Sequence, residues 1–391
     1  MDITLTLMQI TALTAAGMCH ALLGSIKVPL AERLNIDEGK VGGLVSIFGF
    51  TLIPMAFAAG IIADSQGKQF VVVSGCILLI ASVIVLSSVD SYLKALISVL
   101  LLGTGWSAMV NVLNALQGPA FQPLKDGATL FFAMNLGDFI FGLGAFVMPI
   151  AVAWSLRAFN LKGTFLAFAA LIVIPLLLSF GVDWKSLQTE SSEVVDNAFQ
   201  ILLGDQVILL CCIAFFFHVP IEATVATWAT TLMKDRGLAD KTTTLLLSVF
   251  WGTFTLSRLV AAIIFSLIPS GYHHASAIVL AILCIGFSLG LVKSQSGKLT
   301  ATLLIAAGAI LGPLFPILIA MLVGHVLDTN AALQGRAIGL FFCIGGIGWA
   351  IIPLIVGQIA KKTSVQKGFV VIVACAFCLT ILCVLLMRSH A

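Results

Sequence analysis

Six ionisable side chains of this sequence stand inside apolar runs that are long enough to cross a membrane. They are His20, Lys27, Asp138, His218, Glu222 and Arg258. A charge at the centre of a bilayer costs roughly 2.5–3.5 kcal/mol, so such side chains usually face a cavity or a partner. Glu222 follows Pro220 by two residues, and the helix can open there because proline lacks a backbone donor. We therefore expect Glu222 to bind a proton or a polar substrate.

Each of these groups also has a purely structural interpretation. Glu222 can form a permanent ion pair with Lys27 or a histidine and so hold two helices together. His20 and His218 can donate to hydroxyl groups or titrate near neutrality, but either can equally complete a hydrogen bond between helices. Lys27 is near a helix end, where its long side chain can simply reach the interface.

Neutral polar and aromatic side chains in the same runs can recognise a hydroxylated ligand. The candidates are Ser107, Asn111, Asn114, Asn135, Trp106, Trp228 and Trp251. Hydrogen bonding between helices is the alternative for the serine and the asparagines. Tryptophans near span ends commonly anchor a helix at the interface, although Trp228 is well suited to stack on a sugar face.

A short polar stretch, Gly60-Ile-Ile-Ala-Asp64-Ser-Gln-Gly67-Lys68, separates two apolar runs, 41–63 and 70–88. Six residues, 64–69, form the expected loop, so the two runs should be antiparallel helices. Gly60 allows the close approach of another helix, and Gly67 allows a tight turn. Asp64 places a negative charge where a helix N-terminus can receive it.

The composition is that of a membrane protein. The 391 residues are 60% hydrophobic and only 9% charged, whereas soluble proteins keep roughly a quarter of their residues charged. The first apolar run is too long for a signal peptide and lacks a basic start. All nine cysteines lie in apolar runs and are expected to be free thiols. We find no catalytic constellation, metal site, cofactor motif or nucleic-acid patch, so the chain is not expected to be an enzyme.

Hydropathy predicts twelve spans. They are roughly 4–28, 41–63, 70–88, 93–115, 128–153, 163–182, 205–232, 243–267, 275–293, 300–326, 337–359 and 368–387. The longest polar interval lies between the sixth and seventh spans. It divides the chain into an N-terminal six-helix bundle (1–182), a linker (183–204) and a C-terminal six-helix bundle (205–391).

The two halves resemble each other. Ser46-Ile-Phe48 with Ala59-Gly-Ile-Ile62 recurs 202 residues later as Ser248-Val-Phe250 with Ala261-Ala-Ile-Ile264. The glycine-rich stretch 140–144 recurs 204 residues later as 344–348. These offsets indicate parallel repeats related by an axis along the membrane normal. The second copy lacks the acidic loop, because Ser266 corresponds to Asp64.

The Gly-x-x-x-Asp-x-x-Gly-Lys stretch resembles the signature loop between helices 2 and 3 of the major facilitator superfamily. His218–Trp228, Gly312–Pro316, and Trp251 with Ser257-Arg258 resemble its fucose permease branch of fucose–galactose–glucose:proton symporters. One departure is that Ser107 stands where fucose permease has a membrane glutamate. The resemblance implies an all-α membrane protein of twelve helices in two pseudo-symmetric bundles, with spans 1, 4, 7 and 10 lining a cavity.

The resemblance further implies a monomeric carrier in the plasma (bacterial inner) membrane, with no cofactor. Its substrate would be a small polar organic solute, sugar-like first, taken up with a proton or a sodium ion by alternating access. Transport of an anionic metabolite and export of amphipathic compounds are the alternatives. A non-transporting membrane receptor or scaffold belongs to a different class and would need a large domain outside the membrane.

The resemblance places the termini and the Asp64 loop in the cytoplasm. Lysine and arginine are more frequent in the loops of the opposite side, which favours the reverse orientation.

Two gating contacts are expected, and the residues expected to take part in gating are Gly60, Asp64, Gly67, Lys68, Asp138, Arg258 and Arg336. When the cytoplasmic side closes, Asp64 should meet the backbone donors after Gly335, and Arg336 can add an ion pair. Asp138 and Arg258 should lie at similar depth, and the resemblance implies that their helices face each other, so they should form a second pair across the two halves. The alternative is that each charge pairs within its own half and supports packing.

Overall fold

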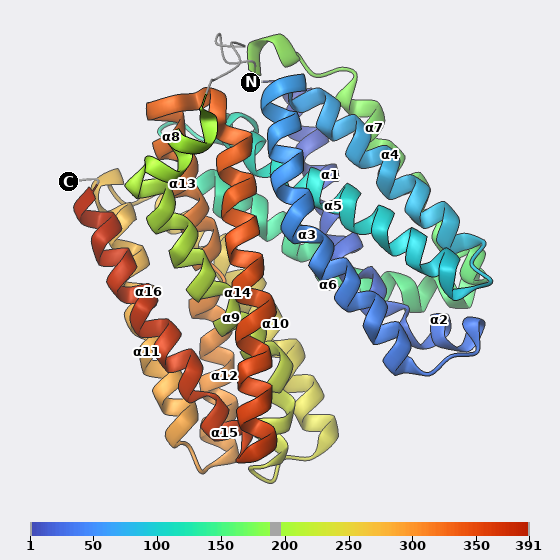
Figure 1. The fold of residues 1–391 in the computed structure, drawn as a ribbon, viewed down its shortest axis with the longest axis vertical. Helices are drawn as coiled ribbons and strands as arrows, with labels where there is room; N and C mark the ends of the chain where they lie inside the picture. Colours follow the sequence, from blue (N-terminus) through green and yellow to red (C-terminus); the bar gives the residue numbers. More distant parts are fainter. Residues whose placement is uncertain (1, 188–196, 390–391) are drawn as a thin grey trace. The chain divides into compact units, whose positions relative to one another are not determined.

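The computed structural model describes residues 2–187 and 197–389, and every regular element in these ranges is a helix (Figure 1). The α-helices are α1 (Ile3–Ser25), α2 (Lys27–Leu34), α3 (Glu38–Gln66), α4 (Lys68–Ser87), α5 (Tyr92–Phe121), α6 (Leu130–Ala158), α7 (Leu161–Ser179), α8 (Ala198–Gly204), α9 (Gln206–Lys234), α10 (Asp240–Phe265), α11 (His273–Lys293), α12 (Gly297–Leu311), α13 (Leu314–Asn330), α14 (Gln334–Lys362), α15 (Val365–Gly368) and α16 (Val370–Ser389). Short 3₁₀ turns are η1 (Gln122–Leu124), η2 (Trp184–Leu187), η3 (Ser270–Tyr272) and η4 (Ala331–Leu333).

Among the described residues, eleven helical stretches are long and apolar enough to cross a membrane. One of them, Gly297–Lys362, is 66 residues long and contains α12, α13 and α14. The predicted tenth span is therefore two helices that break at Gly312-Pro313, and α14 is the eleventh span. Part of the predicted linker, 188–196, lies outside the described residues.

The helices form two compact units. Among the described residues, unit 1 comprises 2–126, 137–187 and 326–343, and unit 2 comprises 127–136, 197–325 and 344–389. Most of unit 1 comes from the first half of the chain and most of unit 2 from the second half, and the predicted bundle boundaries stay a prediction. The first residues of α6 belong with unit 2, and those of α14 belong with unit 1.

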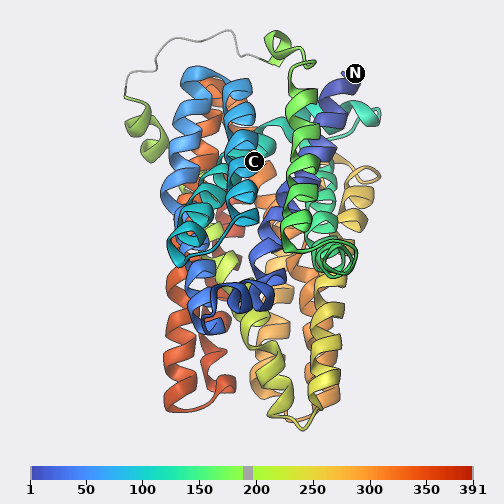
Figure 2. The same ribbon diagram turned by 90° about the vertical axis from the view of Figure 1, so that its right-hand side faces the viewer.

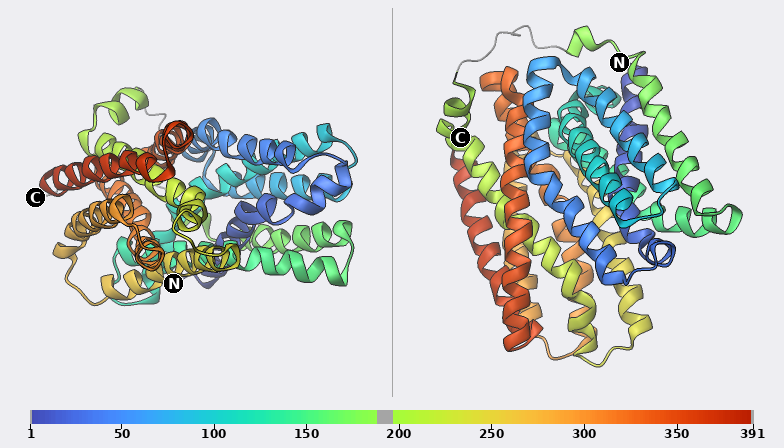
Figure 3. Two further views of the ribbon diagram at one scale, coloured as in Figure 1. Left: turned by 90° about the horizontal axis from the view of Figure 1, so that it is seen from below. Right: turned by 45° about the vertical axis from the view of Figure 1, so that its right-hand side comes forward.

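In unit 1, α5 packs against α1, α3 and α4, and α4 also packs against α7. Figure 2 shows α3, α4 and α5, coloured blue to cyan, lying side by side. In unit 2, α16 packs against α9 and α11, and α12 packs against α10 and α11 (Figure 3). Helix α5 is therefore central in unit 1, and its polar side chains are buried among its neighbours.

Glycines bring helices into backbone contact at matching places in the two repeats. A Cβ atom on Gly144 of α6 would lie 2.2 Å from the carbonyl oxygen of Thr14 in α1. A Cβ atom on Gly348 of α14 would lie 2.3 Å from the carbonyl oxygen of Phe216 in α9. Gly348 follows Gly144 by 204 residues, so the repeated glycine serves the same close helix packing in each unit.

Candidate functional site

The polar stretch after Gly60 is more helical than the sequence indicated. Helix α3 continues to Gln66 and α4 begins at Lys68, so the predicted six-residue loop is wrong and Gly67 alone joins the two helices. Gly67 has φ +89°, which a residue with a side chain rarely adopts. Ser65 donates its hydroxyl hydrogen to the Ile61 carbonyl within α3. Because polar side chains can remain helical at an exposed helix end, only the glycine marks the turn.

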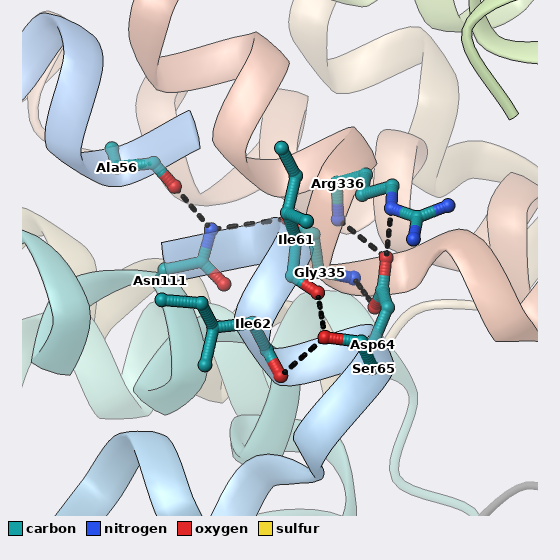
Figure 4. Close-up of polar contacts among 8 residues, drawn as sticks. All are labelled: Ala56, Ile61, Ile62, Asp64, Ser65, Asn111, Gly335 and Arg336. Carbon is teal, nitrogen blue, oxygen red and sulfur yellow. Dashed lines mark hydrogen bonds and ion pairs between the residues drawn. The ribbon is translucent and has the colours of Figure 1, made fainter. Parts of the chain in front are cut away.

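Asp64 lies in the last turn of α3 and binds the start of α14 (Figure 4). The backbone N–H of Gly335 donates to Oδ1 at 2.7 Å, and that of Arg336 donates to Oδ2 at 2.9 Å. The Nε atom of Arg336 lies 3.7 Å from Oδ2, and the Asp64 side chain is only 7% exposed. A carboxylate at a helix N-terminus stabilises it by about 0.3–1 kcal/mol, and up to ~2 kcal/mol when partly buried. The predicted contact is confirmed.

Glycines allow this approach. A Cβ atom on Gly60 would lie 2.1 Å from the Gly335 carbonyl oxygen, and one on Gly335 would lie 2.6 Å from Asp64 Oδ1. One turn further along α14, a Cβ atom on Gly339 would lie 2.7 Å from the Ala56 carbonyl oxygen. We refer to Gly60, Asp64, Gly335 and Arg336 as the Asp64 cluster.

Asn111 of α5 reaches the same crossing (Figure 4). Its side chain is fully buried, and Nδ2 donates at 3.0 Å to the Ala56 carbonyl and at 3.0 Å to the Gly335 carbonyl. Sequence reasoning treated Asn111 as a ligand-binding candidate, but both of its amide hydrogens are used within unit 1.

The other neutral candidates on α5 and α6 are also buried, and each donates to its own helix. Ser107 donates to Gly103, Asn114 to Val110 and Asn135 to Phe131, in every case to the carbonyl four residues earlier. Their predicted role in hydrogen bonding a ligand stays a prediction.

A cavity of about 520 Å³ lies beside the Asp64 cluster in unit 1. Asp64 and Lys68 line it together with Phe70, Trp184 and Gln334. Lys68, a predicted gating residue, is the first residue of α4 and is half-buried.

His20 belongs to an aromatic cluster in unit 1. Its ring is exposed and stacks on Trp106, with ring centroids 5.1 Å apart and an interplanar angle of 26°. Phe141 of α6 and Phe48 of α3 lie 5.9 and 6.3 Å from the same imidazole. Sequence reasoning missed these two phenylalanines, because nothing in an apolar run distinguishes them from lipid-facing ones.

Lys27 is the first residue of α2, at the break that ends α1.

His218 and Glu222 lie one turn apart on α9 in unit 2. His218 is fully buried, and among the described residues neither of its ring nitrogens has a hydrogen-bond partner. Its Nε2 atom lies 4.0 Å from Oε2 of Glu222, whose side chain is 27% exposed. The indole nitrogen of Trp228, further along α9, also lacks a partner within the described part of the chain. Helix α9 therefore carries a carboxylate one turn from an imidazole and, further along, an indole N–H, and neither ring has a hydrogen-bond partner among the described residues.

The remaining candidates are separated between the units. Arg258 of α10 donates from Nε to the Gly312 carbonyl at 3.0 Å, and its guanidinium lies 4.5 Å from the centre of the Phe254 ring. Trp251 packs edge-on against Phe254 and is 37% exposed. Asp138 of α6 is 5% exposed and belongs to unit 1. Since Arg258 belongs to unit 2, the predicted Asp138–Arg258 pair stays a prediction.

Comparison with protein-family models identifies one family over most of the chain. The family model described as Major Facilitator Superfamily matches residues 10–353. The chain is 22% identical over 394 residues to Bypass of stop codon protein 6 of Saccharomyces cerevisiae, covering 90% of this chain and 76% of that protein. Its fold is similar to that of the E. coli fucose:proton symporter FucP, with a TM-score of 0.78, 13% identity and 97% of each chain covered.

A shorter match is 32% identical over 179 residues to Glycerol-3-phosphate acyltransferase 1 of Deinococcus radiodurans. It covers 80% of that protein but only 43% of this chain, whereas the family model and the fold similarity extend over most of the chain. Apolar membrane helices of unrelated proteins share much of their composition. The family model therefore decides the family.

Proposed function

Since the chain belongs to the major facilitator superfamily, we propose that this multi-pass membrane transporter takes up a small polar, sugar-like solute by alternating access, coupled to a proton or a sodium ion. The fucose:proton symporter FucP shares the fold at 13% identity, which supports a carrier architecture but not a particular substrate.

The observation that carries the coupling proposal is the pair on α9. Glu222 is an acid in a membrane-spanning helix, partly exposed and 4.0 Å from an imidazole that makes no hydrogen bond within the described residues. Such a carboxylate can release its proton or bind a cation when the local environment changes, and the unused donor and acceptor of His218 suit a ligand hydroxyl. Pro220 between them removes one backbone donor, which gives this part of α9 freedom to adjust.

The Asp64 cluster supplies the conformational part of the proposal. We place it at the cytoplasmic end of a bacterial inner-membrane protein, where it would stabilise the state that is closed on that side. Breaking its hydrogen bonds would then favour opening to the cytoplasm. A cysteine at Ser65 should be shielded from an impermeant thiol reagent in intact cells, and one at Thr363 should be labelled; the opposite pattern would reverse the orientation.

The test is uptake into proteoliposomes from a pooled library of sugars and organic acids, with an imposed pH or sodium gradient. Glu222→Gln keeps the hydrogen-bonding shape but cannot titrate, so gradient-driven accumulation should fall by more than about tenfold while counterflow exchange persists. Glu32→Gln, on the exposed side of α2, is the matched control. Normal accumulation by Glu222→Gln would reject Glu222 as the coupling site, and accumulation of organic acids alone would reject the sugar-like substrate.

A further inference from the structure

Asn111 joins three helices of unit 1 at one point. It projects from α5, the helix at the centre of the unit, and donates to Ala56 of α3 and to Gly335 of α14. Both donor–acceptor distances are 3.0 Å, and the side chain has no exposed surface. Two long-range hydrogen bonds from one buried nitrogen fix the amide with respect to both neighbouring helices.

The peptide groups of Gly335 are held from two sides. Its N–H donates to Asp64, and its carbonyl accepts from Asn111 (Figure 4). The Ala56 carbonyl, the second acceptor of Asn111, is also the atom against which Gly339 packs. The first turn of α14 therefore lies against α3 in an orientation that Asn111 helps to set.

The chemistry of asparagine explains why this residue type fits. The Nδ2 atom carries two hydrogens, and here each meets a backbone carbonyl. The oxygen Oδ1 is buried and has no donor among the described residues, so rotating the amide by 180° would bring that oxygen against carbonyl oxygens. Asn111 has no remaining donor with which to recognise a ligand in this arrangement.

We propose that Asn111 is a positioning residue of the gate: it orients the Gly335–Arg336 peptide group near the start of α14 toward Asp64 and links the Asp64 cluster to α5. The proposal rests on the gating role proposed for that cluster. Because α5 also carries Trp106, on which His20 stacks, Asn111 connects the gate with the helix that forms part of the aromatic cluster. A displacement of α5 would then weaken the hold on Gly335 and release α14.

The test measures, without any substrate, the separation between the end of α3 and the end of α13, which leads through η4 into α14. Spin labels at Ser65→Cys and Asp328→Cys, both at exposed positions of unit 1, report it in a background from which the nine native cysteines have been removed. Asn111→Leu keeps a similar volume but removes both hydrogen bonds. Asn111→Asp also removes the donors and places a carboxylate against two carbonyls. Each should lower the ratio of short to long distances by about tenfold or more, since two buried hydrogen bonds are lost.

Asn114→Leu is the matched control, because Asn114 lies three residues further along α5 and donates to its own helix. It should leave the distance distribution unchanged. In a double-mutant cycle, Asn111→Leu should add little to Asp64→Asn, because both variants release the same peptide. This cycle compares distances in the folded protein, so it remains informative if one single variant is less stable.

An unchanged distance distribution in both Asn111 variants would overturn the proposal, as would fully additive effects in the cycle. Loss of ligand binding with an intact short distance would instead make Asn111 a binding residue. If the distances lengthen in the Asn111 and Asp64 variants while transport continues normally, the positioning role stands and the gating role of the Asp64 cluster fails.

Discussion

Two equivalent helix contacts, α3 with α14 and α10 with α6, are stabilised by different interactions. In unit 1 the end of α3 binds the start of α14 through a carboxylate, two backbone N–H groups and closely packed glycines. In unit 2 the end of α10 meets the start of α6 through aromatic rings. Phe131 follows the repeat relation to Gly335, and its ring lies 5.5 Å from that of Phe265.

Histidines complete the second arrangement. His273 of α11 lies 5.2 Å from Phe131 and 4.9 Å from Phe265, and His274 lies 5.2 Å from Phe131. The Nδ1 atom of His273 lies 3.2 Å from the Thr129 hydroxyl, within hydrogen-bond distance. We refer to Phe131, Phe265, His273 and His274 as the Phe131 cluster.

The difference shows how each contact would fail. The Asp64 cluster depends on directional hydrogen bonds to an anion, so a displacement of a few tenths of an ångström at the glycines weakens several bonds together. The Phe131 cluster depends on ring packing, which tolerates sliding and decreases gradually with separation. Hydrogen bonds like those of the Asp64 cluster suit a gate that opens and closes sharply. Ring packing like that of the Phe131 cluster suits a hinge that stays packed.

The largest expected effect is steric. Gly60→Ala places a methyl group 2.1 Å from the Gly335 carbonyl oxygen, so α14 must move away from α3. We expect a cost of about 2–3 kcal/mol to the closed Asp64 cluster, as for an overpacked core. Ala262 is the equivalent residue of α10 and already carries a methyl group. The control is Gly252→Ala, because a Cβ atom on Gly252 would face open space. The Ser65–Asp328 spin-label distance measures the outcome, and an unchanged distance in Gly60→Ala would contradict it.

An intermediate effect is expected in unit 2. Phe131→Ala removes a ring that is 7% exposed and should lower the free energy of unfolding by about 3 kcal/mol through lost packing. Because this cluster belongs to unit 2 and the Asp64 cluster belongs to unit 1, we expect no change in the Ser65–Asp328 distance. Half-buried Phe132 is the control, and its alanine variant should cost less. Thermal unfolding in detergent measures the first quantity; a lengthened spin-label distance would show that the two clusters are coupled.

The smallest effect concerns a carboxylate that caps its own helix. Asp205 accepts from the N–H groups of Val207 and Ile208 at the start of α9, and His325 lies 2.7 Å from it. Burial raises the pKa of Asp205. The hydrogen bonds from His325 and from the backbone together lower the pKa by more than burial raises it, so the pKa lies below the ordinary 3.8. The ionised form is therefore favoured by folding, and its stabilisation is present above pH 3.8 and lost as the pH falls.

Asp205→Ala should lower the free energy of unfolding by about 1 kcal/mol at neutral pH, as for other lost N-caps. The difference from the natural protein should shrink when unfolding is measured at decreasing pH below 3.8. A difference that stays constant or grows on acidification would show that the carboxylate charge is not the source of the stabilisation.

Sequence reasoning was successful where a property is local. Runs of about twenty apolar residues predict spans because a helix of that length crosses the hydrocarbon layer, and the described helices follow the predicted spans closely. The loop 64–69 was predicted wrongly because polar residues at a helix end resemble a loop in hydropathy. The two-helix nature of the tenth span was missed, although Gly312-Pro313 is a signal that favours a break.

The amino-acid sequence by itself determined that this protein is a repeated, lipid-embedded bundle, since span length, low charge and the recurring glycines are all read along the chain. Only the tertiary structure decided which polar groups meet. Gly335 lies 271 residues from Asp64 and 224 from Asn111, and hydropathy carries no information about which buried faces are paired. Asp64 and Asp205 both accept hydrogen bonds from a helix N-terminus. The donors of Asp205 lie within three residues of it in the chain, whereas the donors of Asp64 belong to another helix, α14. A buried donor must be satisfied by a group at hydrogen-bond distance, and that distance is set by the packing of glycine surfaces far apart in the chain.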